Sequence, residues 1–221
     1  MLGTGHGKPC PVFFRTHYRP STPQTSHISF CESGGRRILS MPAIAVPELD
    51  FSPGQVLCLH IPHGFHLQEA AIEQGILRAS QHANKSVLIC RPATGRRGLR
   101  EFIRRQRTVE WLARAGDISK ADAAQVIDEF GVTVREIMCH NAGTPRCFLG
   151  IAAAICRKPD VLLYSSAGLD PLGRVAVHHY VAANGQNLCA VHLSGASAFG
   201  DGTPAPRVCP PRARCIELQP G

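Results

Sequence analysis

The sequence predicts an α/β fold built on a largely parallel β-sheet. Short apolar runs typical of buried strands alternate with longer segments whose apolar residues recur at helical spacing, and this order is typical of strand–helix–strand units. Proline, glycine and other turn residues bound the short runs, as expected at strand ends. The chain has 221 residues, which is enough for one large α/β domain or two small ones with a sizeable core.

The first elements follow a segment without visible periodicity. Residues 1–42 combine glycine, serine, threonine and histidine with several prolines, and they are expected to form a poorly ordered arm. Order is expected to begin near Ile44, with a turn at Pro53-Gly54 and a buried strand over Gln55–His60. The strand leads into Pro62-His63-Gly64, which predicts a tight loop.

Helices and strands continue to alternate after this loop. A helix is expected over Gln68–Ser80, a strand over Lys85–Cys90, and two helices over Thr108–Ala115 and Ser119–Phe130. Ser119 is a candidate N-cap, because its hydroxyl can accept a backbone N–H of the first helical turn.

The second half of the chain repeats this alternation. A helix is expected over Pro145–Arg157, a strand beginning at Val161, a helix over Gly173–Ala183 and a strand over Leu188–His192. Residues 201–221 are rich in glycine and proline and are treated as a separate C-terminal segment.

Composition narrows the class of protein. No apolar run approaches the roughly 18 residues of a membrane span, and no secretory signal opens the chain, so we expect a soluble cytosolic protein. The ten cysteines are scattered, which favours reduced thiols over a disulfide framework. The net charge of +8 favours an anionic partner such as a nucleotide, a lipid headgroup or nucleic acid.

One segment carries a family resemblance. Arg157–Arg174 reads RKPDVLLYSSAGLDPLGR, and it resembles the Walker B strand and D-loop of ABC-transporter ATP-binding subunits, whose usual text is KPDVLLLDEPTSGLDPLGR. The flanks match, but the Asp-Glu pair at the centre is replaced by Tyr164, Ser165 and Ser166. In that family one carboxylate holds magnesium and the other polarises the attacking water, so no catalytic residue can be assigned here.

The loop after the first strand resembles the family's phosphate-binding loop in position. Pro62, His63 and Gly64 stand where the family writes Pro, Asn and Gly. Leu67 replaces the lysine that reaches the phosphates, and Gln68 replaces the Ser or Thr that holds magnesium. The resemblance implies ATP and Mg²⁺ as cofactors, while these substitutions remove the side chains that would bind them.

Three further residues correspond to functional positions of the family. Gly143 falls in the signature segment that serves the partner's nucleotide, and Asp170 falls in the D-loop at the subunit contact. His192 is the candidate switch histidine, one residue early in the register. Together with Pro62, His63, Gly64 and Gln68, these residues are the candidate nucleotide-site residues.

The resemblance implies a P-loop NTPase-like domain over residues 43–200, with a small helical subdomain at about residues 100–145. It implies an ATP-binding transport protein of degenerate sequence that has lost or impaired ATP hydrolysis, and whether the chain is an enzyme stays open. The implied partners are a membrane permease and either a second copy or a competent cassette. The implied location is the cytoplasm, with a peripheral position at the inner face of the membrane as a variant.

Two other interpretations stay open. The basic segment Arg91–Arg107 could bind nucleic acid or an anionic membrane without catalysis, although a solvated basic face is the default for such a run. The chain could also be a decayed or frameshifted cassette. The spacing of His60, His63 and His66 suggests metal ligands, but a fourth ligand is missing nearby, so no metal site is predicted.

Overall fold

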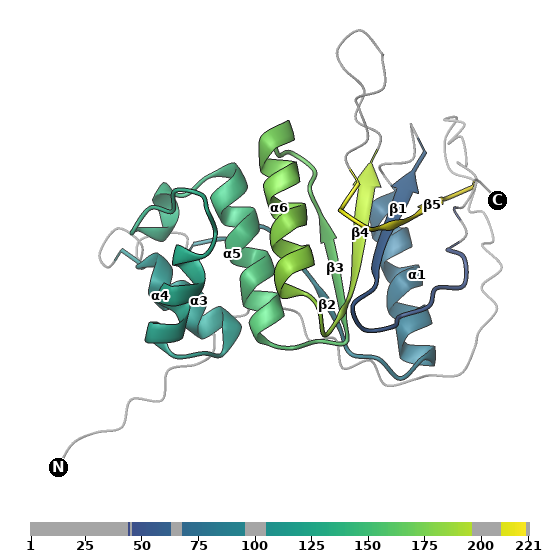
Figure 1. Ribbon diagram of the computed structural model, residues 1–221, viewed down its shortest axis with the longest axis horizontal. Coiled ribbons are helices and arrows are strands. Elements are labelled where there is room, and N and C mark those ends of the chain that lie inside the picture. The colour runs from purple at the N-terminus through teal and green to yellow at the C-terminus, as the bar shows by residue number, and fades with distance from the viewer. Residues whose placement is uncertain (1–43, 45, 63–67, 96–104, 196–208, 220–221) are drawn as a thin grey trace, which may run out of the picture. The chain divides into compact units, whose positions relative to one another are not determined.

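The computed structural model describes residues 44, 46–62, 68–95, 105–195 and 209–219, all of which belong to the unit Ala43–Gly221. Five strands form one sheet in the order β2-β3-β4-β1-β5, and every neighbouring pair is parallel. The strands are β1 (Val56–Ile61), β2 (Val87–Ile89), β3 (Val161–Ser165), β4 (Cys189–Gly195) and β5 (Arg214–Glu217). Figure 1 shows them side by side.

Helices precede or follow the strands as the alternation predicts. The α-helices are α1 (Glu69–His82), α3 (Thr108–Gly116), α4 (Lys120–Asp128), α5 (Gly143–Cys156) and α6 (Pro171–Asn184), and η2 (Met138–His140) is a short 3-10 helix. None of these helices exceeds 14 residues, whereas a membrane span needs about 20. The described part of the chain therefore contains no helix able to cross a bilayer.

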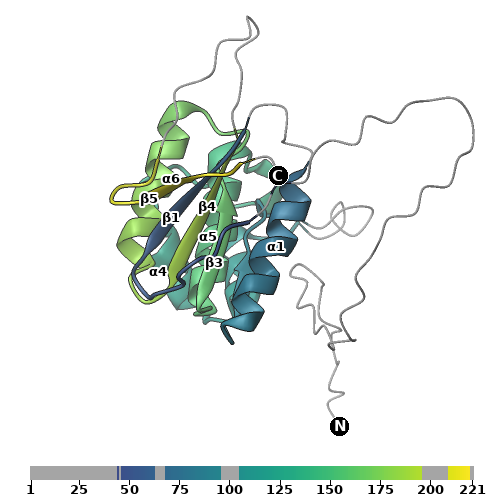
Figure 2. The same ribbon diagram turned by 90° about the vertical axis from the view of Figure 1, so that its right-hand side faces the viewer.

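The helices cover both faces of the sheet. From β1 the chain crosses through α1 to the far edge at β2, and it then returns strand by strand through α5 and α6. Because parallel crossovers are right-handed, the two directions place helices on opposite faces. Figure 2 shows α1 on one side of the sheet and α5 and α6 on the other.

The α1 face holds the main apolar core. Ile72 and Ile76 of α1 pack on side chains that alternate along the central strands. The strand residues in this core include Leu57, Leu59, Ile61, Val161, Leu163, Val191 and Leu193. Each is at most 3% exposed, so these strands are buried as parallel strands between two helical layers should be.

A helical group built from α3 and α4 packs against α5. Phe130, just beyond α4, meets Phe148 of α5 and Tyr180 of α6, and each pair of ring centroids lies 5.3 Å apart. Such aromatic contacts contribute beyond simple area burial. The group therefore shares its core with the helices that cover the sheet.

The predicted α/β class and largely parallel sheet are confirmed, and the expected strands and helices appear near their predicted positions. Ser119 is the N-cap of α4, as predicted, because its hydroxyl accepts the Asp122 N–H at 3.1 Å. Several boundaries shift by two or three residues: β4 runs three residues past His192, and α5 and α6 each begin two residues earlier than predicted, at Gly143 and Pro171. The segment predicted as residues 201–221 supplies β5, while the predicted arm of residues 1–42 lies outside the described residues.

Candidate functional site

The ends of three strands and the N-termini of two helices meet at the carboxyl edge of the sheet. The strands are parallel, so β1, β3 and β4 all end there, and the N-termini of α5 and α6 adjoin the end of β3. The connections from β1 and β4 leave in opposite directions along the sheet. Ligands of open α/β sheets bind at such a switch point, which makes this edge the candidate site.

The loop at the end of β1 is described only at its two ends. Pro62 follows β1 directly, and Gln68 stands at the N-cap position of α1. The Gln68 side-chain oxygen accepts the Ile44 N–H at 3.1 Å, so this amide helps to hold the chain that precedes β1. His63 and Gly64, together with Leu67, lie outside the described residues.

Gly143 opens α5 with a left-handed backbone. Its φ is +42°, and a Cβ at this position would meet no atom within 4 Å, so the helix start is open to solvent. Ala142, the N-cap residue, gives no side-chain hydrogen bond, and the first turn carries no acidic residue. The N–H groups and the positive end of the α5 dipole are thus not offset by a capping side chain.

Asp170 caps α6 beside this helix start. Its Oδ1 accepts the Gly173 N–H at 2.8 Å, and Pro171 begins the helix. A Cβ at Gly173 would overlap the hydroxyl of Thr144, so the first turns of α5 and α6 are in close contact. The structure therefore brings the candidate residues Gly143 and Asp170 into one neighbourhood.

An apolar side chain projects from the same end of α6. Leu172 is 82% exposed and Val175 is 41% exposed, one helical turn further on. They are the exposed large hydrophobic residues identified in the described part of the chain. This pair, Leu172 and Val175, lies next to the Asp170 cap and is called the α6 apolar pair below.

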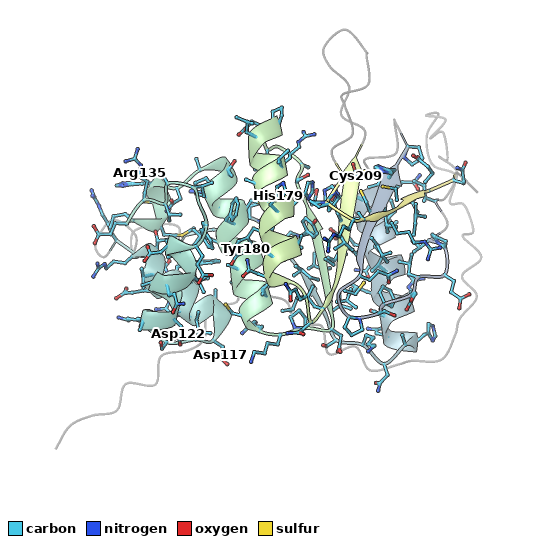
Figure 3. All side chains as sticks on the ribbon, viewed as in Figure 1. Asp117, Asp122, Arg135, His179, Tyr180 and Cys209 are labelled. Carbon is cyan, nitrogen blue, oxygen red and sulfur yellow. The ribbon has the colours of Figure 1, made fainter. Side chains whose placement is uncertain are left out.

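The end of β3 lacks the carboxylates of a magnesium site. Leu163 and Tyr164 are 1% exposed or less, and Ser166 is 6% exposed. The Tyr164 hydroxyl pairs with His178 Nδ1 at 3.1 Å. Tyr164 and His178 are both buried, although Tyr164 stands near a strand end and His178 has a neighbour, His179, at the surface (Figure 3).

His192 lies inside the sheet, not at its edge. Its Nε2 faces the Ser166 hydroxyl at 3.0 Å, and its Nδ1 faces Cys58 Sγ at 3.4 Å. Its ring also packs edge-on against His178, with centroids 4.5 Å apart. Desolvation first, and then the nearby His178, His60 and Arg174, lower the His192 pKa to about 2. The imidazole is therefore neutral at neutral pH, and both of its nitrogens have protein partners.

This buried polar network was not predicted from sequence. It joins Cys58, Tyr164 and His192 from three strands to Ser166 and His178. The strand register places Tyr164 opposite His192 and His192 opposite Cys58. Polar residues in strands that should be wholly apolar were the available signal, since buried polar groups require partners.

The retained KPD sequence has a structural role. Asp160 Oδ2 accepts the Ser86 N–H at 2.8 Å and the Ser86 hydroxyl at 2.6 Å. These bonds from Ser86 lower the Asp160 pKa. The Asp160 carbonyl also accepts the Cys189 N–H at 2.8 Å, so this residue joins the starts of β2, β3 and β4.

The basic segment is paired at both of its described ends. Arg91 forms an ion pair with Glu73, which is 6% exposed, and Arg107 lies 2.9 Å from Glu136. Residues 96–104 lie outside the described residues. Binding of an anionic partner through this segment stays a prediction.

Comparison with known proteins shows a shared fold. No family model matches the chain, and no curated protein matches it. A Pyrococcus furiosus protein assigned as an ABC transporter ATP-binding protein superposes with a TM-score of 0.53 at 8% identity, covering 80% of this chain and 94% of that one. At this identity the chain shares the fold of an ABC-type ATP-binding protein, and activity does not follow from it.

Two further solved structures give weaker superpositions. One is an ABC transporter assigned to the metal-chelate type, in an inward-facing conformation, with a TM-score of 0.47 and 15% identity over 69% of this chain and 73% of that one. The other is the complex of archaeal ribosomal stalk protein aP1 and ribosome recycling factor aABCE1. It gives a TM-score of 0.40 and 13% identity over 71% of this chain and 38% of that chain.

Proposed function

We propose that this chain is an ABC-ATPase-like protein that has lost ATP hydrolysis and acts by pairing with a second ATP-binding cassette. The proposal rests on a difference between two parts of the carboxyl edge of the sheet, namely the end of β3 and the starts of α5 and α6. The end of β3 is filled by Tyr164 and Ser166 with their histidine partners. The start of α5 remains open and uncapped, and the start of α6 carries an exposed apolar pair.

The chemistry of the α5 and α6 starts suits a contact between subunits. Gly143 leaves the N–H groups of α5 accessible to an anion, such as the nucleotide phosphate held by a partner. Leu172, at 82% exposure, supplies an apolar anchor of the kind that is buried at the centre of an interface. Asp170 keeps both helix starts in place by capping α6.

The wider role follows the resemblance of the sequence. In this proposal the chain is cytoplasmic, docks on a membrane permease with its partner cassette, and takes part in transport without hydrolysing ATP. Its own loop at Pro62–Gln68 binds Mg-ATP poorly, because Leu67 stands at the lysine position. In this proposal His192 has a structural role inside the protein, where it contacts Ser166 and Cys58.

Association can be tested with variants of the α6 start. We expect the parent chain to pair with itself or with a co-encoded cassette in sedimentation velocity, and Leu172→Glu to weaken the pairing at least tenfold. Leu172 is so exposed that this change should leave the unfolding free energy nearly unchanged. Ala121→Glu, which adds the same charge at an exposed position of α4 beside the C-terminal end of α5, serves as the control.

Asp170 distinguishes a capping role from a pairing role. Asparagine retains the capping ability of Asp170, whereas alanine removes it at a cost of about 1 kcal/mol. We expect Asp170→Asn to fold normally and to pair more weakly. If Asp170→Asn and Leu172→Glu both pair as well as the parent, the proposed function is wrong.

The rival binding function has its own test. If the basic segment binds nucleic acid or anionic vesicles, charge reversal at Arg96, Arg97, Arg100 and Arg104 should weaken retention, and added salt should have the same effect. Retention that is insensitive to both changes would exclude this function. Co-purification with the cassette is expected to be unaffected by these four substitutions.

A further inference from the structure

Four potential metal ligands gather beside the edge strand β5. They are Cys58 and His60 of β1, Cys209 in the chain before β5, and Cys215 of β5. We propose that these four side chains bind one zinc ion. The site is independent of the pairing contact proposed above, since it uses none of Gly143, Asp170 and Leu172, although Cys58 also faces His192 Nδ1.

The fold explains why these residues meet. Cys58 and His60 are two residues apart on a strand, so their side chains project from the same face. In the parallel pairing of β1 with β5, Cys215 is the register partner of Cys58. Cys209 then approaches the same face from the segment that leads into β5 (Figure 3).

The donor atoms have the spacing of a tetrahedral site. His60 Nε2 lies 3.4 Å from Cys209 Sγ, and Cys209 Sγ lies 3.2 Å from Cys215 Sγ. All four donor atoms lie within 4.8 Å of one another. For a zinc–sulfur distance of about 2.3 Å, the edge of a regular tetrahedron is about 3.8 Å, and the observed separations surround this value.

The ligand set selects zinc. Three thiolates and one imidazole form a Cys3His set, which fills all four positions of a structural zinc ion. Soft sulfur ligands disfavour magnesium and calcium, which require oxygen. On binding, each of the three thiols loses its proton to solvent, and the neutral imidazole binds through the Nε2 that faces Cys209.

A zinc ion here would hold the edge of the sheet together. Strand β5 has only four residues, and Arg214, Cys215 and Glu217 are exposed, so little apolar burial fixes it to β1. Cys215 and Cys209 would join this strand and its approach to the buried Cys58 and His60. A metal ion that links distant parts of the chain in this way can stabilise a strand that buries too little apolar surface to be held by packing alone.

Cobalt provides the direct test. We expect the full chain, purified under reducing conditions and stripped with chelator, to bind one Co²⁺ with the absorption of a tetrahedral thiolate complex, and equimolar Zn²⁺ to abolish that absorption. Cys209→Ser and Cys215→Ser should each weaken Co²⁺ binding at least tenfold. Cys139→Ser, which changes an exposed thiol elsewhere, should bind as the parent does.

A second measurement guards against a folding defect. In the parent and in Cys139→Ser, zinc should slow amide hydrogen exchange over residues 214–218, whereas exchange within α5 should change little. Failure of the reduced parent to bind Co²⁺ would overturn the proposal, as would equal binding by all variants. A Cys209–Cys215 disulfide that forms in preference to metal binding under reducing conditions would also overturn it.

Discussion

Asn141 shows how a single buried amide can organise a junction between elements. Its side chain is 2% exposed; Nδ2 donates to the Thr108 hydroxyl and to the Arg135 and Ile137 carbonyls, and Oδ1 accepts the Arg135 N–H. These bonds join the start of α3 to the chain before α5. A buried amide whose oxygen and nitrogen are both paired stabilises the fold, because its removal leaves buried polar groups without a hydrogen bond.

We expect Asn141→Ala to lower the free energy of unfolding by about 2 kcal/mol, because the Arg135 N–H loses its acceptor and the Thr108 hydroxyl and two carbonyls each lose one hydrogen bond. Denaturant unfolding followed by circular dichroism measures the change. Asn184→Ala is the control, since Asn184 is exposed and its side chain donates only to the Tyr180 carbonyl within α6. A similar small loss in both variants would contradict this role for Asn141.

His192 gives a pH-dependent stability. Its pKa falls from 6.5 to about 2 on folding, so below pH 6.5 the unfolded chain binds a proton that the folded chain does not. Stability from this residue is therefore present above pH 6.5 and decreases as the pH falls. Between pH 7 and pH 5 the loss is about 2 kcal/mol, since each pH unit below 6.5 contributes about 1.4 kcal/mol.

Comparison with His192→Gln isolates this contribution from those of the other histidines. We expect the variant to be less stable than the parent at pH 7 but to lose about 2 kcal/mol less between pH 7 and pH 5. Urea unfolding at the two pH values gives both numbers. Equal losses in the parent and in the variant would show that the folded chain protonates His192 as readily as the unfolded chain does.

Among the elements, α5 makes the closest backbone contact. A Cβ on Gly150, in the middle of this helix, would overlap the carbonyl oxygen of Arg91. The Ala93 N–H also donates to the Arg146 carbonyl at 2.8 Å. Glycine at position 150 therefore allows the chain after β2 to lie directly on α5.

We expect Gly150→Ala to cost about 2 kcal/mol or more, because the added methyl group must displace backbone rather than a flexible side chain. Gly143→Ala is the comparison on the same helix, where space is open but φ is +42°, and it should cost about 1 kcal/mol through backbone strain. Thermal unfolding of both variants tests the order. A smaller loss for Gly150→Ala than for Gly143→Ala would contradict the close contact.

The elements also show what the sequence can reveal. The spacing of apolar residues and the positions of turn residues predicted the helices and strands, because an element that packs in the core must place apolar residues at the period of a helix or a strand. The end of β4 was missed because His192 interrupts the apolar run, although its ring is buried. The cluster of Cys58, His60, Cys209 and Cys215 was missed because strand pairing, not local spacing, brings residues 149 positions apart into contact.

At the scale of the whole molecule, the fold of an ABC-type ATP-binding protein is present, while Leu67 and Tyr164–Ser166 stand where the sequence resemblance predicts charged residues. The five parallel strands place the β1 loop and the end of β3 at one edge. The resemblance assigned Gly143 to the signature segment and Asp170 to the D-loop, and the structure places both residues at the starts of adjoining helices. The sequence could not reveal that Tyr164 and Ser166 have histidine partners, since the first contact depends on how α6 packs and the second on how β3 pairs with β4.

We therefore expect ATP hydrolysis by the isolated chain to be indistinguishable from buffer. Phosphoryl transfer relies on positioned charge, yet Leu67 replaces the phosphate lysine, and no acid occurs from Leu163 to Ser166. Phosphate release from Mg-ATP, measured with the parent and with Gly64→Val, provides the test. Turnover of about 1 s⁻¹, the low end for working enzymes, that Gly64→Val abolishes would show that this loop binds nucleotide productively and that an acid elsewhere completes the site.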